Sequence, residues 1–285
     1  MESYRVISTD KGFRSWYESI PRDQRALAID LEAEFNLHIY GEHFCLLQVY
    51  DGREAVAIDP YEVSIDLIKA LLEDRERLKI TYDSASDRLL LYKNHGILMN
   101  TILDLRPAVD ILEFQKQGLS SVLEEVLSLP PSGEKKKFQQ YNWTKRPIDP
   151  GALAYAIEDV FHLYRLRDAL IHRIVEAGLL DRYLVENFRL QAAVPETERK
   201  PGMLRGGRFR RLEPAQQALL EELHAVREEV AREVNLPPNT VYPNTELFNL
   251  ATGRGAPRDA RRSRPVPERA FEKLLARLEE IAFRR

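Results

Sequence analysis

The sequence predicts an α/β domain over residues 1–192 and a small all-helical domain over residues 213–285, joined by a basic linker at 193–212. Strand-like and helix-like runs alternate through the first part, which is typical of an α/β domain. A stretch with two prolines, three glycines and six basic residues, VPETERKPGMLRGGRFRRLE, then interrupts the alternation. Beyond it, apolar residues recur at helical spacing, which indicates a helical module.

Three strands are expected near the start of the domain, at residues 26–31, 44–50 and 55–58. Asp51-Gly52 lies between the last two and is a hairpin turn signal, so this pair should be antiparallel. A short strand follows at residues 78–82.

Helical periodicity predicts the remaining elements. In the longest segment, Asp149 can cap the helix and Pro150 can occupy its first turn. The expected helices lie at residues 65–72, from about 86, at 120–127, at 150–175 and, in the tail, at 214–234, 245–251 and 267–282.

The composition is that of a soluble globular protein, with 44% apolar and 31% charged residues. The N-terminus, MESYRVISTD, is polar, and no run approaches the roughly 18 apolar residues of a membrane span. We therefore expect a cytoplasmic protein without a membrane partner. The single cysteine, Cys45, excludes an intrachain disulfide and is expected to be a small core residue.

Charge is divided unequally between the two parts. Residues 1–190 carry 24 Lys and Arg against 31 Asp and Glu, a net charge of −7, whereas residues 191–285 carry 18 against 14, a net charge of +4. A basic tail is compatible with contact to a phosphate backbone. A chance asymmetry of a solvated surface explains the same numbers equally well.

The run LAIDLEAEF ends a buried-looking strand with Asp30 and Glu32. Side chains two apart in a strand share one face, so these carboxylates project together. They repel each other unless a cation lies between them, and oxygen ligands favour Mg²⁺ or Mn²⁺. An exposed strand end is the alternative explanation of this pair.

Three further residues suggest the same site. Asp87 lies in the first turn of an expected helix, where an acid can simply complement the helix dipole. Tyr155 and Asp159 stand four apart on the 150–175 helix and so share a face. Taken singly, Tyr155 could be a core aromatic and Asp159 a surface charge.

Together these residues resemble the RNase D branch of the DEDD 3′-to-5′ exonucleases. Asp30 and Glu32 match the family's Asp-x-Glu strand, Asp87 in YDSASDRLLL matches its second motif, and Tyr155 with Asp159 matches its Tyr-x-x-x-Asp helix. The resemblance covers about residues 3–190. It implies a ribonuclease H-like mixed sheet flanked by helices.

The stretch KKFQQYNWTKRP resembles a further family segment through Lys136, Gln139, Trp143, Arg146 and Pro147. The resemblance implies that the first four contact nucleic acid. For two of them an alternative stays open, in which Trp143 packs in the core and Arg146 pairs with an acid.

The sequence departs from the family pattern at two positions. Tyr82 stands where relatives often have His, which puts its expected contact with substrate in question, and Asn142 replaces the usual Asp before Trp143. Asp83 competes with Asp87 for the second motif, although the spacing favours Asp87.

In the tail, LHAVREEVAREVNLPPNTVYPNTELFNLA resembles an HRDC domain, and there is room for one such module. Arginines of the linker and of a later loop are candidate phosphate contacts, and each can equally be a solvated side chain. They are Arg205, Arg208, Arg210, Arg211, Arg254, Arg258, Arg261, Arg262 and Arg264.

The resemblance implies a metal-dependent 3′-5′ exoribonuclease that uses two divalent ions, Mg²⁺ or Mn²⁺, and releases 5′-mononucleotides. Asp30 would bridge both ions, Glu32 and Asp159 would hold the ion that activates water, Asp87 would serve the other ion, and Tyr155 would orient the water. The expected substrate is RNA with a single-stranded 3′ end, such as a tRNA precursor, and no obligate protein partner is expected. The alternatives are a 3′-5′ DNA exonuclease and an inert nucleic-acid-binding module.

Overall fold

The computed structural model describes residues 4–129, 135–138, 140–198 and 200–283. The chain divides into two compact units, Met1–Ala33 with His43–Thr197 and Glu34–Glu42 with Glu198–Arg285. Within the described ranges, no helix has the length and apolar character needed to cross a membrane.

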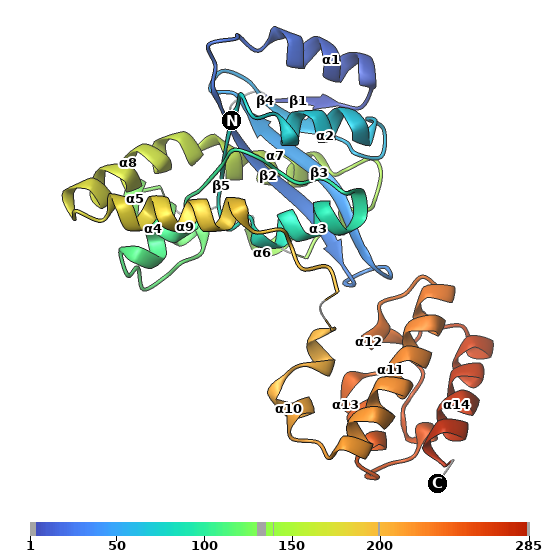
Figure 1. Cartoon of the computed structure of the whole chain (residues 1–285). Coiled ribbons are helices and arrows are strands. Elements are labelled where there is room, and N and C mark those ends of the chain that lie inside the picture. The colour runs from blue at the N-terminus through green and yellow to red at the C-terminus, as the bar shows by residue number, and fades with distance from the viewer. Residues whose placement is uncertain (1–3, 130–134, 139, 199, 284–285) are drawn as a thin grey trace. The chain divides into compact units, whose positions relative to one another are not determined.

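The first unit is built on a six-stranded sheet of order β1-β4-β3-β2-β5-β6 (Figure 1). β3 and β4 are antiparallel, as the Asp51-Gly52 turn predicts, whereas β1 pairs parallel with β4, and β5 parallel with both β2 and β6. The sheet is therefore mixed, as expected. Its strands are β1 Tyr4–Ile7, β2 Ala26–Phe35, β3 Glu42–Tyr50, β4 Ala55–Ile58, β5 Leu78–Thr81 and β6 Ile102–Asp104.

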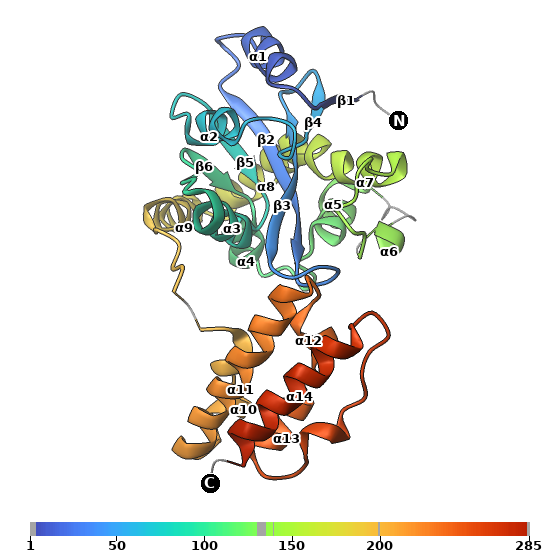
Figure 2. The same ribbon diagram turned by 90° about the vertical axis from the view of Figure 1, so that its right-hand side faces the viewer.

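Helices cover both faces of this sheet (Figure 2). The apolar faces of α1 Asp10–Ser19, α2 Ile65–Glu73 and α3 Ala85–His95 pack on one side, and their buried residues form one core with strands β2, β3 and β4. The opposite side carries α4 Arg106–Ile111, α5 Leu119–Leu127, α7 Pro150–Phe161 and α8 Leu163–Glu176. Strands β1 and β6 and helices α1, α4 and α9 were not anticipated from the sequence.

Strand β2 places alternate residues on the two faces. Leu27, Ile29 and Leu31 are buried in the α1–α3 core, whereas Ala28 is buried in the core on the opposite face. The period of two therefore turns Asp30 and Glu32 towards the side that α7 covers.

The helix expected at 150–175 is two helices, because α7 ends at Phe161 and α8 begins at Leu163. The expected start is confirmed. Pro150 is the first residue of α7, and the carboxylate of Asp149 accepts hydrogen bonds from the backbone N–H groups of Gly151 (2.8 Å) and Ala152 (3.2 Å).

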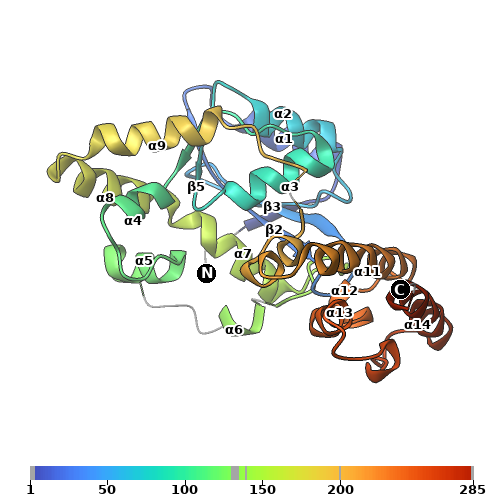
Figure 3. The ribbon, with the colours of Figure 1, turned by 60° about the horizontal axis from the view of Figure 1, so that its bottom comes forward.

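After α8 the chain reverses into α9 Leu180–Ala192, and the two helices lie side by side (Figures 1 and 3). Two buried residues of α9, Tyr183 and Asn187, face β6 and bond to its last residue, Asp104. Helix α9 thus closes the β6 edge of the sheet.

From residue 200 to residue 283 the second unit is helical and has its own core. Leu204 and Phe209 are buried in that core, so the later half of the expected linker belongs to this unit. Its elements are the short turns Gly202–Leu204 and Pro257–Asp259 and the helices α10 Gly207–Arg210, α11 Pro214–Glu233, α12 Pro238–Val241, α13 Asn244–Ala251 and α14 Glu268–Ala282.

The cap of α7 can be tested directly. Asp149→Ala removes the acceptor of two backbone N–H groups and is expected to lower the free energy of unfolding by about 1 kcal/mol. Asp149→Asn keeps an acceptor and should lose less. Urea denaturation of both variants measures the difference, and equal losses would contradict the capping role.

Candidate functional site

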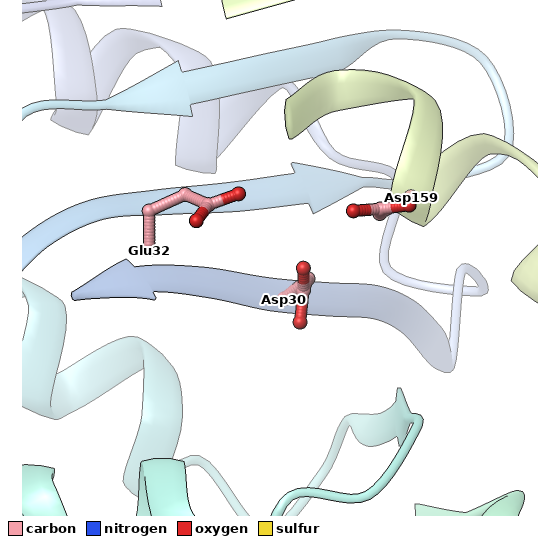
Figure 4. A group of neighbouring side chains, drawn as sticks. All are labelled: Asp30, Glu32 and Asp159. Carbon is pink, nitrogen blue, oxygen red and sulfur yellow. The ribbon is translucent and has the colours of Figure 1, made fainter. Parts of the chain in front are cut away.

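Three acids from two elements converge on the α7 side of the sheet. Asp30 and Glu32 come from β2, and Asp159 comes from α7, two residues before that helix ends. Each offers one carboxylate oxygen, and these atoms all lie within 4.8 Å of one another (Figure 4). Residues more than 120 positions apart thus meet in one cluster.

Asp87 lies in the first turn of α3 and is not a member of this three-residue cluster. Burial is the main cause of the raised pKa values of Asp30 and Glu32, and the negative charge of Asp87 adds to both. Asp83, the competing candidate, forms an ion pair with Arg106 at 3.1 Å instead. Asp87 is therefore the acid of this segment that acts on the cluster.

The acids are costly to ionise together. Burial, followed by the negative charge of Asp87, raises the pKa of Asp30 to about 8. Burial and the charges of Asp30, Asp159 and Asp87 hold the pKa of Glu32 well above its usual range. Burial, with the charges of Asp104 and Asp83, raises the pKa of Asp87 to about 7.

This chemistry fits a divalent cation. Clustered carboxylates supply the hard oxygen ligands that Mg²⁺ and Mn²⁺ prefer, and a cation among them would offset the repulsion that raises their pKa values. Asp30, Glu32 and Asp159 fit such a group by distance, and Asp87 fits by its electrostatic influence on the same site.

Tyr155 stands one helical turn before Asp159 on α7. Its half-buried ring lies beside Phe138, with 6.0 Å between the ring centroids. Burial and the negative charges of Asp159, Glu32 and Asp30 raise the pKa of its hydroxyl. The hydroxyl therefore stays protonated at neutral pH and can donate a hydrogen bond near the acids.

Two expected nucleic-acid contacts have internal partners instead. Trp143 is only 4% exposed and packs edge-to-face on Tyr141, with 4.9 Å between ring centroids. Arg146 forms a bidentate ion pair with Asp59 (2.5 and 2.8 Å) and donates a bond to the carbonyl of Cys45. The alternative with Trp143 in the core and Arg146 paired to an acid is the one the structure has.

The other expected contacts are less informative. The hydroxyl of Tyr82 donates to the carbonyl of Gln117, which holds the ring at the start of the β5–α3 turn. Lys136 lies in the short helix α6 Lys135–Phe138, but its side chain and the whole of Gln139 lie outside the described part of the chain.

The comparisons with known proteins agree with this architecture. The family model described as 3′-5′ exonuclease matches residues 4–174, and the HRDC domain model matches residues 216–260. The similarity therefore extends over both units.

Curated relatives include Ribonuclease D of Pseudomonas paraeruginosa, 32% identical over 81% of this chain and 61% of the relative. Ribonuclease D of Xanthomonas oryzae is 28% identical over 83% of this chain and 65% of the relative. The chain thus spans somewhat less than two thirds of the length of these relatives.

Among solved structures, Escherichia coli RNase D, described as an exoribonuclease involved in structured RNA processing, matches with a TM-score of 0.71 and 23% identity. The match covers 99% of this chain and 76% of that one. It confirms the expected fold, a ribonuclease H-like mixed sheet followed by a helical HRDC region.

The raised pKa values predict how stability varies with pH when metal is absent. Asp has a pKa near 3.9 in an unfolded chain, so the folded state holds the protons of Asp30 and Asp87 more tightly. The stability they contribute is complete below about pH 4 and is lost as pH rises through about 7 to 8. The melting temperature of EDTA-treated protein should fall as the pH is raised from about 4 to about 8.

Two additions isolate the acids in that experiment. Asp30→Asn should flatten the fall, and Mn²⁺ should raise the melting temperature more at pH 8 than at pH 5 because the ligands must be deprotonated. A metal-free protein whose wild-type and Asp30→Asn forms show the same pH dependence would contradict the assignment.

The ion pair of Arg146 gives a second prediction. Asp59 is buried, so Arg146→Ala leaves a carboxylate unpaired and should lower the free energy of unfolding by about 3 kcal/mol. Arg165→Ala, at an exposed arginine of α8, is the control and should change it by less than about 0.5 kcal/mol. Unaltered unfolding of Arg146→Ala together with weaker RNA binding would favour the nucleic-acid role.

Proposed function

The chain belongs to the 3′-5′ exonuclease family, and from this premise we propose that it hydrolyses RNA from the 3′ end and releases 5′-mononucleotides. The observation that carries the proposal is the convergence of Asp30, Glu32 and Asp159 within 4.8 Å. We assign the reaction to the unit predicted at residues 1–192. The HRDC-like unit predicted at 213–285 would add contacts to the RNA.

The four acids would hold two divalent ions, Mg²⁺ or Mn²⁺. Such ions supply a nucleophilic water at neutral pH and stabilise the charge that develops on the phosphate and the leaving oxygen. Asp30, Glu32 and Asp159 are placed to act together, and Asp87 would contribute from the neighbouring helix α3.

Tyr155 would orient the attacking water. Its hydroxyl keeps its proton because burial and the surrounding carboxylates raise its pKa. It can therefore donate a hydrogen bond to an oxygen at the reaction centre without becoming an additional negative charge there. Position on the same helix face as Asp159 supports this role.

RNA is favoured over DNA as substrate because the curated relatives are named Ribonuclease D. Since the chain covers less than two thirds of them, their activity is carried over only as a proposal. A 3′-5′ DNA exonuclease is the second candidate, because the description of the matching family, 3′-5′ exonuclease, does not distinguish RNA from DNA. Matched RNA and DNA oligomers separate the two, and a strong preference for DNA would overturn the RNA assignment.

Whether the substrates include structured RNA, such as tRNA precursors, is a finer part of the proposal. Single-stranded RNA should be compared with a tRNA that carries a short 3′ extension. Preferred trimming of the extension, with arrest near the duplex, would support processing of structured RNA 3′ ends. Equal degradation of both would argue for a general exonuclease.

Two substitutions test the proposed chemistry. With a 5′-labelled RNA oligomer and Mn²⁺, Asp30→Asn should reduce the rate by about a thousandfold, since a metal ligand is lost. Tyr155→Phe should reduce it by roughly a hundredfold, because only the orienting hydroxyl is removed. Shortening of the oligomer in single-nucleotide steps is the measurement.

Asp168→Asn is the matched control, because Asp168 is an exposed carboxylate of α8. It should degrade RNA at the wild-type rate. If Asp30→Asn and wild type degrade RNA equally, the acids are not the catalytic site. If neither releases mononucleotides, the inert nucleic-acid-binding alternative is favoured.

A further inference from the structure

Asp104, the last residue of β6, is a buried carboxylate outside the four proposed metal ligands. It is only 2% exposed and lies beside Thr81, with which it is paired across strands β5 and β6. The chain leaves β5 after Thr81 and reaches α3, which carries Asp87, within four residues. Asp104 therefore stands next to the turn that delivers Asp87 to the site.

Both oxygens of Asp104 accept hydrogen bonds, and most of the donors belong to that turn. One oxygen accepts from the backbone N–H groups of Asp83 (2.9 Å) and Arg106 (2.9 Å). The other accepts from the backbone N–H (2.7 Å) and the hydroxyl (2.7 Å) of Ser84. Three of the four donors therefore come from the two residues that precede α3.

These bonds determine how α3 begins. Asp83 has a φ of 60°, a left-handed conformation that a non-glycine residue keeps only when its surroundings hold it there. Ser84 is the residue before α3, yet its hydroxyl caps no N–H of the helix and bonds to Asp104 instead. The first turn, with Asp87, is thus located by Asp104 rather than by an ordinary helix cap.

Asp104 is itself held from the opposite side by α9. Its backbone N–H donates to the side-chain oxygen of Asn187 (2.7 Å), and its carbonyl accepts from the hydroxyl of Tyr183 (3.0 Å). Arg88, next to Asp87, donates to the carbonyls of Leu190 and Ala193 at the end of α9. Strand β6 and helix α9 therefore support the start of α3 through these hydrogen bonds.

We propose that Asp104 is a positioning residue: by holding the β5–α3 turn, it sets the place of the Asp87 carboxylate and so the affinity of the site for its divalent ion. The proposal rests on the proposed function, because it takes Asp87 to be a metal ligand. Asp104 touches neither the ion nor the RNA in this role.

Asp104→Asn is the informative variant because it keeps the size of the side chain. The side-chain oxygen of the asparagine can still accept from the two backbone N–H groups that bond to one oxygen of Asp104. The NH₂ group, however, replaces the second oxygen and cannot accept from the backbone N–H of Ser84. Loss of a residue that orients a metal ligand typically weakens metal binding 10- to 100-fold. We expect the Kd for Mn²⁺ to rise by at least about tenfold.

The experiment measures Mn²⁺ binding to the full-length protein by calorimetry, without RNA, and the Mn²⁺ dependence of RNA hydrolysis in parallel. A double-mutant cycle with Asp87→Asn shows whether Asp104 acts through Asp87. Asp104→Asn should weaken Mn²⁺ binding in the wild-type background and have little further effect in the Asp87→Asn background. Saturating Mn²⁺ should restore most of the hydrolysis rate of Asp104→Asn.

Ile7→Val is the control for a merely structural effect. Ile7 is buried and lies in β1, at the edge of the sheet opposite β6, so its shortening removes core packing without touching the support of Asp104. It should lower the melting temperature and change the Kd for Mn²⁺ by less than about twofold. An Ile7→Val protein with a Kd raised as much as that of Asp104→Asn would overturn the proposal.

Other outcomes are equally decisive. Normal Mn²⁺ binding by Asp104→Asn, or an equal loss in both backgrounds of the cycle, overturns this inference and leaves the proposed function standing. A wild-type protein that binds no Mn²⁺ overturns the proposed function and the inference with it.

If Asp104→Asn does not fold, Ser84→Ala is the variant to use. It removes one hydrogen-bond donor to Asp104 and should raise the Kd for Mn²⁺ about threefold. An unchanged Kd would overturn the inference.

Discussion

The repulsion between carboxylates that the fold forces together is the constraint on which the candidate site depends. Strand β2 turns Asp30 and Glu32 to one face, and α7 brings Asp159 to the same place. Burial weakens the solvation of each negative charge, so the pKa values of Asp30 and Glu32 rise. A cluster of buried carboxylates lowers the stability of the protein by itself, and a bound cation would offset that loss.

The scaffold withstands this repulsion because the elements that carry the acids are anchored elsewhere. Alternate residues of β2 are buried in an apolar core, and α7 is capped by Asp149 and packed through Ala152, Ala156 and Ile157. Burial of such side chains contributes on the order of 1.5–3 kcal/mol for each larger residue. The acids therefore occupy positions that apolar packing has already determined.

The sequence predicts the strand and helix around each acid better than it predicts which residues lie together in the folded domain. Strand alternation is a local rule, so the shared face of Asp30 and Glu32 could be derived, as could the capped start of α7. Strand β6, with three residues, is too short for a pattern, and Asp104 was missed with it. For Trp143 and Arg146 the sequence leaves two roles open, because their internal partners depend on tertiary structure: Asp59 lies 87 positions from Arg146.

The four acids are held by two separate parts of the fold. Asp30, Glu32 and Asp159 depend on the contact of β2 with α7, whereas Asp87 depends on α3 and its support from β6 and α9. Carboxylate oxygens of Asp30, Glu32 and Asp159 lie within 4.8 Å of one another, and Asp87 is not a member of this group. Small shifts at the start of α3 would therefore alter the contribution of Asp87 while leaving the cluster intact. If the site holds divalent ions as proposed, this separation makes the β5–α3 turn a place where a change remote from β2 and α7 would alter how well Asp87 contributes to ion binding.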